Sequence, residues 1–113
     1  IMVAASSDVE VVGNQVSGYA NAIVGIQQAR GDGAYGPHLL SGLNVHHNTV
    51  AVADGRVGIA TDTGDSSVFT DRGNGFDYNT YRDTNGRSYS WDGDVIGRRE
   101  WVDAGQDPNG IWE

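Results

Sequence analysis

Short stretches of alternating apolar and polar residues recur along the chain. Val9 and Val11 flank the polar Glu10, and the same alternation returns at residues 43–45. An alternation with a period of two places apolar side chains on one face of a strand and polar side chains on the other. The pattern predicts short β-strands that bury one face.

An asparagine recurs at a fixed place after these stretches. Asn14, Asn48 and Asn79 follow one another at intervals of 34 and 31 (48−14 and 79−48), and each precedes an apolar or aromatic side chain two positions later. A second landmark has offsets of 33 and 32 and occupies residues 24–26, 57–59 and 89–91. A third apolar pair is fainter and occupies residues 3–4, 39–40 and 68–69. These landmarks indicate a repeated unit that offers three short strands.

Three strands per unit close one turn of a coil, and stacked coils pair equivalent strands in parallel. The sequence therefore predicts an all-β solenoid, a parallel β-helix of about four coils, over residues 1–96. Residues 97–113 form a predicted C-terminal cap, because residues 97–105 read as a short helix that ends at Gly105. Trp101 is available there to cover the core.

The three repeated asparagines are expected at one corner of the coils. An asparagine tolerates the left-handed conformation of a tight bend, and its amide can bond to the asparagines above and below. Asn14, Asn48 and Asn79 are thus predicted to form a structural ladder, with ordinary exposed turn residues as the alternative. None of them is a glycosylation acceptor.

Composition narrows the classes of partner. Fifteen acidic residues against seven basic ones give a net charge of −8, and all the basic residues are arginines. This balance argues against nucleic acid as a partner. No apolar run approaches the roughly 20 residues of a membrane span. The absence of cysteine excludes disulfides and thiolate metal sites but leaves the redox compartment undecided.

The chain opens directly on a strand-like stretch, residues 1–5, without a polar lead-in. We expect that upstream coils, or another chain, cover this N-terminal edge, because an open strand edge pairs readily with other strands.

Three stretches carry a resemblance to a known family. They are residues 25–31 with the following 35–38, residues 45–50, and the closing residues 100–107 with Trp101 before Gly-Gln-Asp. In these the chain resembles secreted right-handed parallel β-helix proteins related to pectate and alginate lyases. The resemblance implies a right-handed coil, a secreted or cell-surface location and polysaccharide as the substrate class. It leaves open whether the chain is an enzyme, because such proteins include lyases, hydrolases, epimerases and adhesins.

The histidines are candidates for acid–base chemistry or metal binding. His46 and His47 are adjacent, and neighbours on a strand point to opposite faces, so both can bind one metal ion only at a bend. The sequence favours one histidine packed at a corner and one in solvent.

The richest acidic cluster lies in residues 61–72. Asp62 and Asp65 are the predicted metal ligands there, since carboxylates on a glycine-containing loop suit Ca²⁺. The spacing matches no full calcium-loop signature. The sequence requires no cofactor. Ca²⁺ is the cofactor that both the acidic cluster and the resemblance allow.

Tyr35, His38 and Arg72 are the predicted carbohydrate contacts, because aromatic rings stack on sugars and the loop around residues 30–38 is long. Uronate lyase chemistry within this segment is disfavoured, since it needs a base and positive charge and the chain has no lysine.

Three functions remain open. The first is a C-terminal module of an extracellular protein that associates with polysaccharide or the cell surface and is not catalytic by itself. The second is a part of a polysaccharide lyase or hydrolase whose catalytic residues lie mostly upstream. The third is a structural subunit that assembles through its open N-terminal edge.

Overall fold

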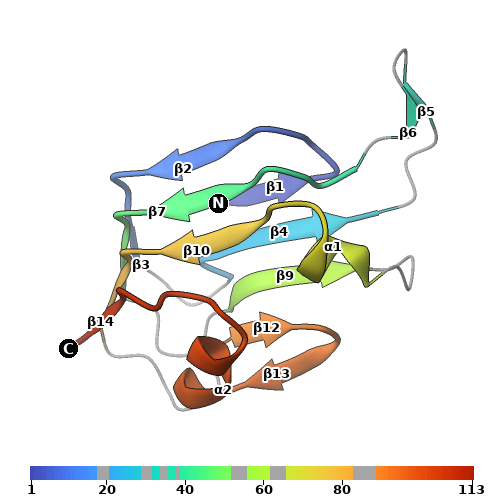
Figure 1. Cartoon of the computed structure of the whole chain (residues 1–113). Helices are drawn as coiled ribbons and strands as arrows, with labels where there is room; N and C mark the ends of the chain where they lie inside the picture. Colours follow the sequence, from blue (N-terminus) through green and yellow to red (C-terminus); the bar gives the residue numbers. More distant parts are fainter. Residues whose placement is uncertain are drawn as a thin grey trace.

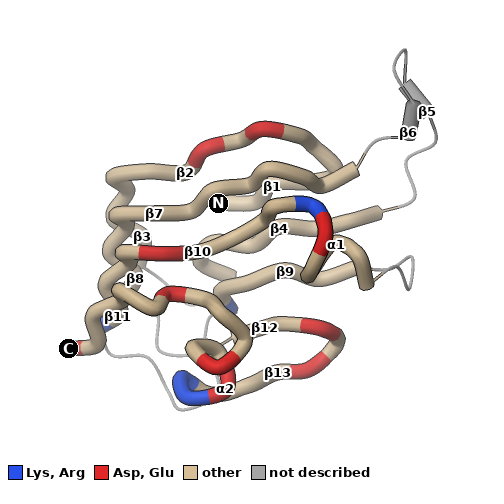
Figure 2. Tube along the Cα trace, in the orientation of Figure 1, with Lys and Arg blue, Asp and Glu red and all other residues tan. Residues whose placement is uncertain are grey.

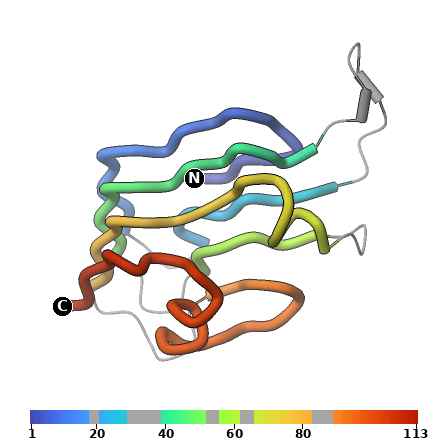
Figure 3. Tube along the Cα trace, in the orientation of Figure 1, coloured from blue at the N-terminus to red at the C-terminus, as the bar shows by residue number. Residues whose placement is uncertain are grey.

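The computed structural model describes most of the chain, namely residues 1–17, 21–28, 32–33, 36–37, 39–51, 56–61, 66–82 and 89–113. Short strands lie in layers, one above another, from the N-terminus at one end to the C-terminal segment at the other (Figures 1 and 3). Strands far apart in sequence are therefore neighbours in space.

The largest sheet has five strands in the order β1-β4-β9-β12-β13. Their bounds are β1 (Met2–Ala4), β4 (Ile23–Gln27), β9 (Val57–Thr61), β12 (Tyr89–Trp91) and β13 (Asp94–Ile96). The first four strands pair in parallel, whereas β13 returns antiparallel to β12. An antiparallel last strand makes this sheet mixed.

Two smaller sheets contain only parallel pairs. One has the order β10-β7-β2, with β2 (Glu10–Val12), β7 (Asn44–His46) and β10 (Gly75–Asp77). The other has the order β14-β11-β8-β3, with β3 (Gln15–Ser17), β8 (Thr49–Ala51), β11 (Thr80–Tyr81) and β14 (Ile111–Trp112). A two-stranded antiparallel hairpin, β5 (Asp32–Gly33) and β6 (Gly36–Pro37), stands apart from these sheets.

The prediction of a right-handed parallel β-helix of about four coils is wrong. The described residues form several small sheets, parallel and mixed, together with two short helices, α1 (Ser67–Thr70) and α2 (Arg98–Asp103). No closed or solenoid sheet is present among them. The antiparallel return of β13 and the helical turn at α1 break the uniform pattern that the repeat predicted.

The spacing of the paired strands is nevertheless regular. Val11 pairs with Val45, and Val45 pairs with Phe76, so the intervals along the chain are 34 and 31 (45−11 and 76−45). In the large sheet Val24 pairs with Gly58, and the interval is again 34 (58−24). The sequence alignment of Gly25 with Gly58 was therefore one residue out of register.

The third apolar landmark was also misassigned. Residues 39–40 are not part of a strand, and Val68 and Phe69 lie in the helix α1. The third strand of each unit instead follows the asparagine directly, as β3, β8 and β11 do. A two-residue apolar signal does not distinguish a strand from a helical turn, because both bury a side chain every few residues.

Two rows of left-handed residues repeat with the same spacing. Asp8, Gly42 and Gly73 have φ of 56°, 63° and 67°, and the intervals between them are 34 and 31 (42−8 and 73−42). The residue directly before each asparagine is also left-handed. These residues are Gly13, His47 and Tyr78, with φ of 68°, 54° and 56°. The chain thus makes the same two bends in each unit, and these bends set the directions of the strands between them.

One apolar core lies between the three larger sheets. Valine, leucine and isoleucine side chains fill its N-terminal part, and aromatic rings fill its C-terminal part. Trp101 of α2 is fully buried, stacks on Tyr89 with centroids 4.9 Å apart, and meets Phe76 and Trp91 edge to face. Gly97 precedes the first residue of the helix as its N-cap, and its backbone N–H donates to the Glu100 carboxylate at 3.1 Å. Trp101 therefore closes the C-terminal end of the core.

Candidate functional site

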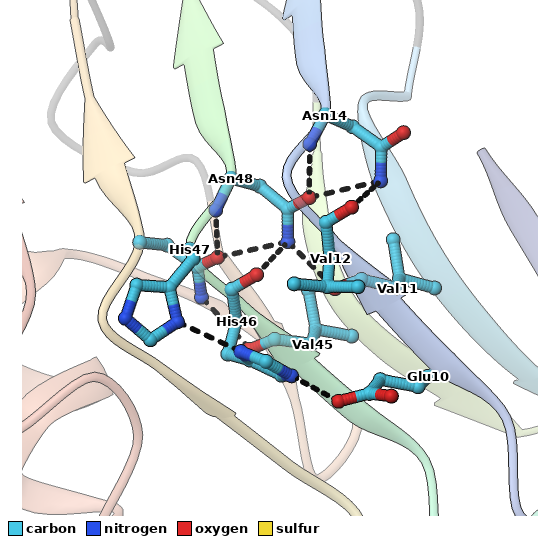
Figure 4. Close-up of polar contacts among 9 residues, drawn as sticks. Glu10, Val11, Val12, Asn14, Val45, His46, His47 and Asn48 are labelled. Atoms are coloured by element: carbon cyan, nitrogen blue, oxygen red, sulfur yellow. Dashed lines mark hydrogen bonds and ion pairs between the residues drawn. The ribbon is translucent and has the colours of Figure 1, made fainter.

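The three asparagines are joined by hydrogen bonds that all run in one direction, and Figure 4 shows the bonds between Asn14 and Asn48. The backbone N–H and the Nδ2 of Asn14 donate to Oδ1 of Asn48, at 2.9 and 3.0 Å. The same two groups of Asn48 donate to Oδ1 of Asn79, at 3.1 and 3.0 Å. Each residue of this asparagine ladder is thus a donor to the next residue along the chain.

The residue before each asparagine makes the bend. Left-handed φ values belong to Gly13, His47 and Tyr78, not to the asparagines, where the sequence had placed them. A left-handed residue reverses the side on which the next side chain lies, so the amides of Asn48 and Asn79 turn inward and are buried. Because the preceding residue makes the bend, the side chains of Asn48 and Asn79 can point into the interior.

Asp107 occupies the next position after Asn79 in the ladder. Its Oδ1 accepts from the backbone N–H of Asn79 at 3.2 Å and from its Nδ2 at 2.9 Å. Its Oδ2 accepts from the Tyr81 hydroxyl at 2.5 Å and from Trp101 Nε1 at 2.9 Å. A carboxylate has no hydrogen to pass on, so the ladder ends at Asp107.

Burial shifts the titration of this end of the ladder. The pKa of Asp107 lies above its ordinary value because burial disfavours the charged form more than the bonds from Tyr81, Trp101 and Asn79 favour it. The pKa of Tyr81 is raised well above its ordinary value by burial and by the adjacent Asp107 carboxylate. Both groups therefore hold their protons more tightly in the folded chain.

His46 and His47 form a second polar group, on the outer face of the sheet that contains β2, β7 and β10. Their Nδ1 atoms lie 2.8 Å apart and their rings meet edge to face (Figure 4). As expected, one histidine is packed and one is in solvent, since His46 is half-buried and His47 is exposed, but the two rings do not lie on opposite faces. The φ of 54° at His47 makes a bend that brings both rings to one side.

Neighbours hold both rings in place. Nε2 of His46 lies 2.5 Å from Oε1 of Glu10, which comes from the adjacent strand β2. The ring of His47 stacks on the ring of Tyr78, with centroids 5.0 Å apart and an interplanar angle of 6°. We call Glu10, His46, His47 and Tyr78 the histidine cluster.

Asp77 lies beside the histidine cluster, and hydrogen bonds hold its carboxylate in place. Its oxygens accept from the backbone N–H of Tyr78 and from the backbone N–H and Nδ2 of Asn109, at 2.9 to 3.0 Å. Partial burial raises the pKa of Asp77, but these bonds and the nearby His47 outweigh it, so the pKa is lowered. Figure 2 shows acidic residues on β10 and on the segment that leads into β2.

The N-terminal end of the layers is open. The strands β1, β2 and β3 are each the edge strand of a different sheet, and each pairs with one neighbour only among the described strands. Asn14 lies between β2 and β3, and its Oδ1 accepts no hydrogen bond from any residue that the structure describes. Ile1, Met2 and Val12 at this end are 46%, 63% and 46% exposed.

Most of the other predicted site residues lie outside the described residues. This applies to the metal ligands Asp62 and Asp65 and to the carbohydrate contacts Tyr35 and His38. Arg72 is described, and its Nη1 donates at 3.1 Å to Oε1 of the buried Gln27, which also accepts from the backbone N–H of Leu40. These contacts brace the inside of the fold. A role for Arg72 toward sugar stays a prediction.

Sequence reasoning missed Asp107, Tyr78 and the pairing of Glu10 with His46. The interval of 28 between Asn79 and Asp107 (107−79), close to the intervals between the asparagines, was the available signal for the first. The pairing of Glu10 with Asn44 across the sheet places Glu10 one strand away from His46. Tyr78 aligns with His47 at an interval of 31 (78−47), the same as that between Asn48 and Asn79.

Comparison of the chain with protein-family models, with curated proteins and with solved structures found no match. In the part of the chain that the structure describes, no helix has the length and apolar character to cross a membrane. Polysaccharide association, secretion and the absence of nucleic-acid binding stay predictions from the sequence.

Proposed function

We propose that the chain is an assembly module whose edge strands β1, β2 and β3 receive further parallel strands from another polypeptide segment. The observation that carries this proposal is the open acceptor at Asn14. Every other residue of the asparagine ladder, and Asp107 at its end, accepts two hydrogen bonds at Oδ1 from the residue before it. Oδ1 of Asn14 lacks these two donors among the described residues.

The direction of the hydrogen bonds in the ladder defines which groups the partner segment must offer. The partner segment must place a backbone N–H and a side-chain amide where both donate to Oδ1 of Asn14. An asparagine that follows a bend supplies both donors, as Asn14 and Asn48 do. A strand pair parallel to β2 and β3, with an asparagine between its strands, meets these requirements.

A second copy of this chain does not meet them. Both hydrogens of Asn14 Nδ2 are directed to Val12 and Asn48, so an Asn14 facing an identical Asn14 has no side-chain donor to offer. The opposite end of the ladder is Asp107, which only accepts. The partner is therefore a different segment.

The open edge has the other properties of a strand-pairing surface. Edge strands present unpaired backbone groups that bind additional strands, and proteins usually block such edges with charge, proline or a covering element. At this end the exposed apolar side chains of Ile1, Met2 and Val12 accompany the unpaired backbone. Burial of these side chains adds an apolar contribution to the backbone hydrogen bonds.

The test uses a synthetic peptide that copies residues 9–28, the chain's own segment with the strands β2, β3 and β4. It is titrated into the intact ¹⁵N-labelled chain. We expect chemical-shift changes in the amides of β1, β2 and β3 and in the side-chain amide of Asn14, with none at β13. A peptide with Asp in place of the asparagine that copies Asn14 is the matched control. It should bind about tenfold more weakly, because it loses one side-chain donor worth about 1.4 kcal/mol.

Two outcomes contradict the proposal. One is the absence of edge shifts at millimolar peptide, or shifts that cluster at β13. The other is a homodimer in sedimentation velocity that is lost on Met2→Lys or Val12→Lys, because that result would make the partner a second copy.

A further inference from the structure

The contact with Glu10 selects one tautomer of the neutral His46 ring. A carboxylate 2.5 Å from Nε2 accepts the hydrogen of that nitrogen. In the neutral ring the other nitrogen, Nδ1, then carries a lone pair and no hydrogen. Metal-binding histidines are held in this way, with the nitrogen that does not bind the metal donating to a carboxylate. Glu10 therefore prepares His46 to bind a metal ion through Nδ1.

The second ligand, Nδ1 of His47, lies within hydrogen-bond distance of Nδ1 of His46. Because Nδ1 of His46 carries no hydrogen, Nδ1 of His47 is the donor in the metal-free chain, and its hydrogen would move to Nε2 of the same ring on metal binding. Two nitrogens 2.8 Å apart, each about 2.0–2.1 Å from a shared ion, subtend an angle of about 85–90° at that ion. Neighbouring ligands in square-planar or octahedral coordination subtend about 90°, whereas tetrahedral zinc sites need a wider angle. The separation of the two Nδ1 atoms thus favours Cu²⁺ or Ni²⁺ over Zn²⁺.

The surroundings suit a cation. The carboxylates of Glu10 and Asp77 lie next to the two rings, and the protein as a whole carries a net charge of −8. Tyr78 covers one face of the His47 ring and limits its rotation. Glu10 contacts the nitrogen of His46 that does not face His47, and the described residues contain no group of three or more metal-binding side chains, so water would fill the other coordination positions.

We propose that His46 and His47 chelate one first-row transition metal ion through their Nδ1 atoms, and that Cu²⁺ binds most tightly, as the usual order of divalent affinities predicts. The left-handed bend at His47 makes the chelate, and Glu10 fixes the ring of His46. This site lies on the outer face of its sheet and does not depend on the docking proposed for the β1, β2 and β3 edge.

The test is a calorimetric titration of the intact chain with Cu²⁺, Ni²⁺ and Zn²⁺, together with electron paramagnetic resonance of the Cu²⁺ form. We expect one equivalent of Cu²⁺ with hyperfine splitting from two imidazole nitrogens, and weaker binding of Ni²⁺ and Zn²⁺. Glu10→Ala should lower the affinity about 10–100-fold, as loss of a supporting carboxylate does. His46→Ala and His47→Asn should lower it further.

Two features of the variants keep the result interpretable. His47→Asn retains a residue that tolerates the left-handed conformation, so the bend survives the loss of the imidazole. His38→Ala removes the one other histidine and should leave the affinity unchanged. Cu²⁺ binding that persists in His46→Ala and His47→Asn, or that disappears in His38→Ala, overturns the proposal. A spectrum with one nitrogen ligand also overturns it.

Discussion

At the scale of single residues, Asp107 shows how one side chain serves three parts of the molecule. It ends the asparagine ladder through Asn79, anchors Trp101 of the helix α2, and accepts the hydroxyl of Tyr81. All four bonds run toward the carboxylate, so the site is built for an acceptor with no hydrogen of its own. Burial without such donors would leave an unpaired charge in the core, which is strongly destabilising.

Asp107 should give the free energy of unfolding a pH dependence of defined sign. Its pKa is raised in the folded chain, so the folded state binds more protons than the unfolded state between the ordinary value of 3.8 and the raised value. The contribution of Asp107 to stability is therefore complete below a pH of about 4 and declines as the pH rises through the raised pKa. Urea denaturation at pH 4 and pH 7 measures it.

Asp107→Asn is the comparison for this measurement. An amide can still accept from Asn79, but its NH₂ group would face the Trp101 N–H, and one unsatisfied buried donor costs about 1–3 kcal/mol. The variant should be less stable than the wild type, and the difference between them should narrow from pH 4 to pH 7. A difference that widens over this range would show that the carboxyl titrates in the opposite direction.

At the scale of elements, the strands β9 and β12 approach closely at one glycine. Gly58 in β9 has a φ of 138°, and a Cβ atom there would lie 2.0 Å from the carbonyl oxygen of Ser90 in β12. Gly75 in β10 has ordinary φ, and the nearest atom to its added Cβ would be 3.8 Å away. The two glycines therefore have different reasons to be present.

We expect Gly58→Ala to destabilise the chain by about 2–4 kcal/mol, because it combines a steric clash with a conformation that alanine avoids. Gly75→Ala is the control, and it should be neutral or slightly stabilising through the lower entropy of the unfolded chain. Thermal unfolding followed by circular dichroism compares the two variants. Equal effects of both would mean that β9 and β12 tolerate a wider spacing than the structure has.

The sequence predicted elements better than their arrangement. Residues around each asparagine were correctly read as strands, because period-two alternation is a direct consequence of strand geometry. The helix around Trp101 was also predicted, from its glycine stop at Gly105 and its apolar side chain. The closing strand β13 was not, since an antiparallel return depends on the residues at 92–93, whose turn the repeat does not contain.

The candidate sites were less accessible to sequence reasoning. The contact between Glu10 and His46 needs the register of β2 with β7, and the approach of His47 to His46 needs the sign of one φ angle. Neither follows from composition or spacing. The asparagine positions were accessible because the spacing repeats, yet the direction of their hydrogen bonds, and hence the open acceptor at Asn14, emerges only from atomic positions.

At the scale of the whole molecule, the two ends differ in how their backbone is protected. The C-terminal end is covered by α2, the antiparallel β13 and the buried Asp107, and Trp101 fills the core behind them. The three sheets end there in β13, β10 and β14, and the backbone of Phe76 in β10 is bonded to Gln106 and Asp107. At the N-terminal end the edge strands β1, β2 and β3 have one strand neighbour each, and Asn14 is the open ladder residue. A protein with this asymmetry should open from one end, since local opening is easiest where few buried contacts hold a strand.

Amide hydrogen exchange measured by NMR should therefore show a gradient along the layers. We expect the least protection in β1, β2 and β3, more in β7, β8 and β9, which have strands on both sides, and the slowest exchange near Trp101. A peptide that docks on the edge should slow exchange in β2 and β3 and leave β12 unchanged, because it supplies the neighbour that these strands lack. Uniform protection in the free chain would argue against the edge as the site of opening. Faster exchange at β12 than at β2 would show that the chain opens first near α2. The open acceptor at Asn14 and the closed end at Asp107 would then not determine which end opens first.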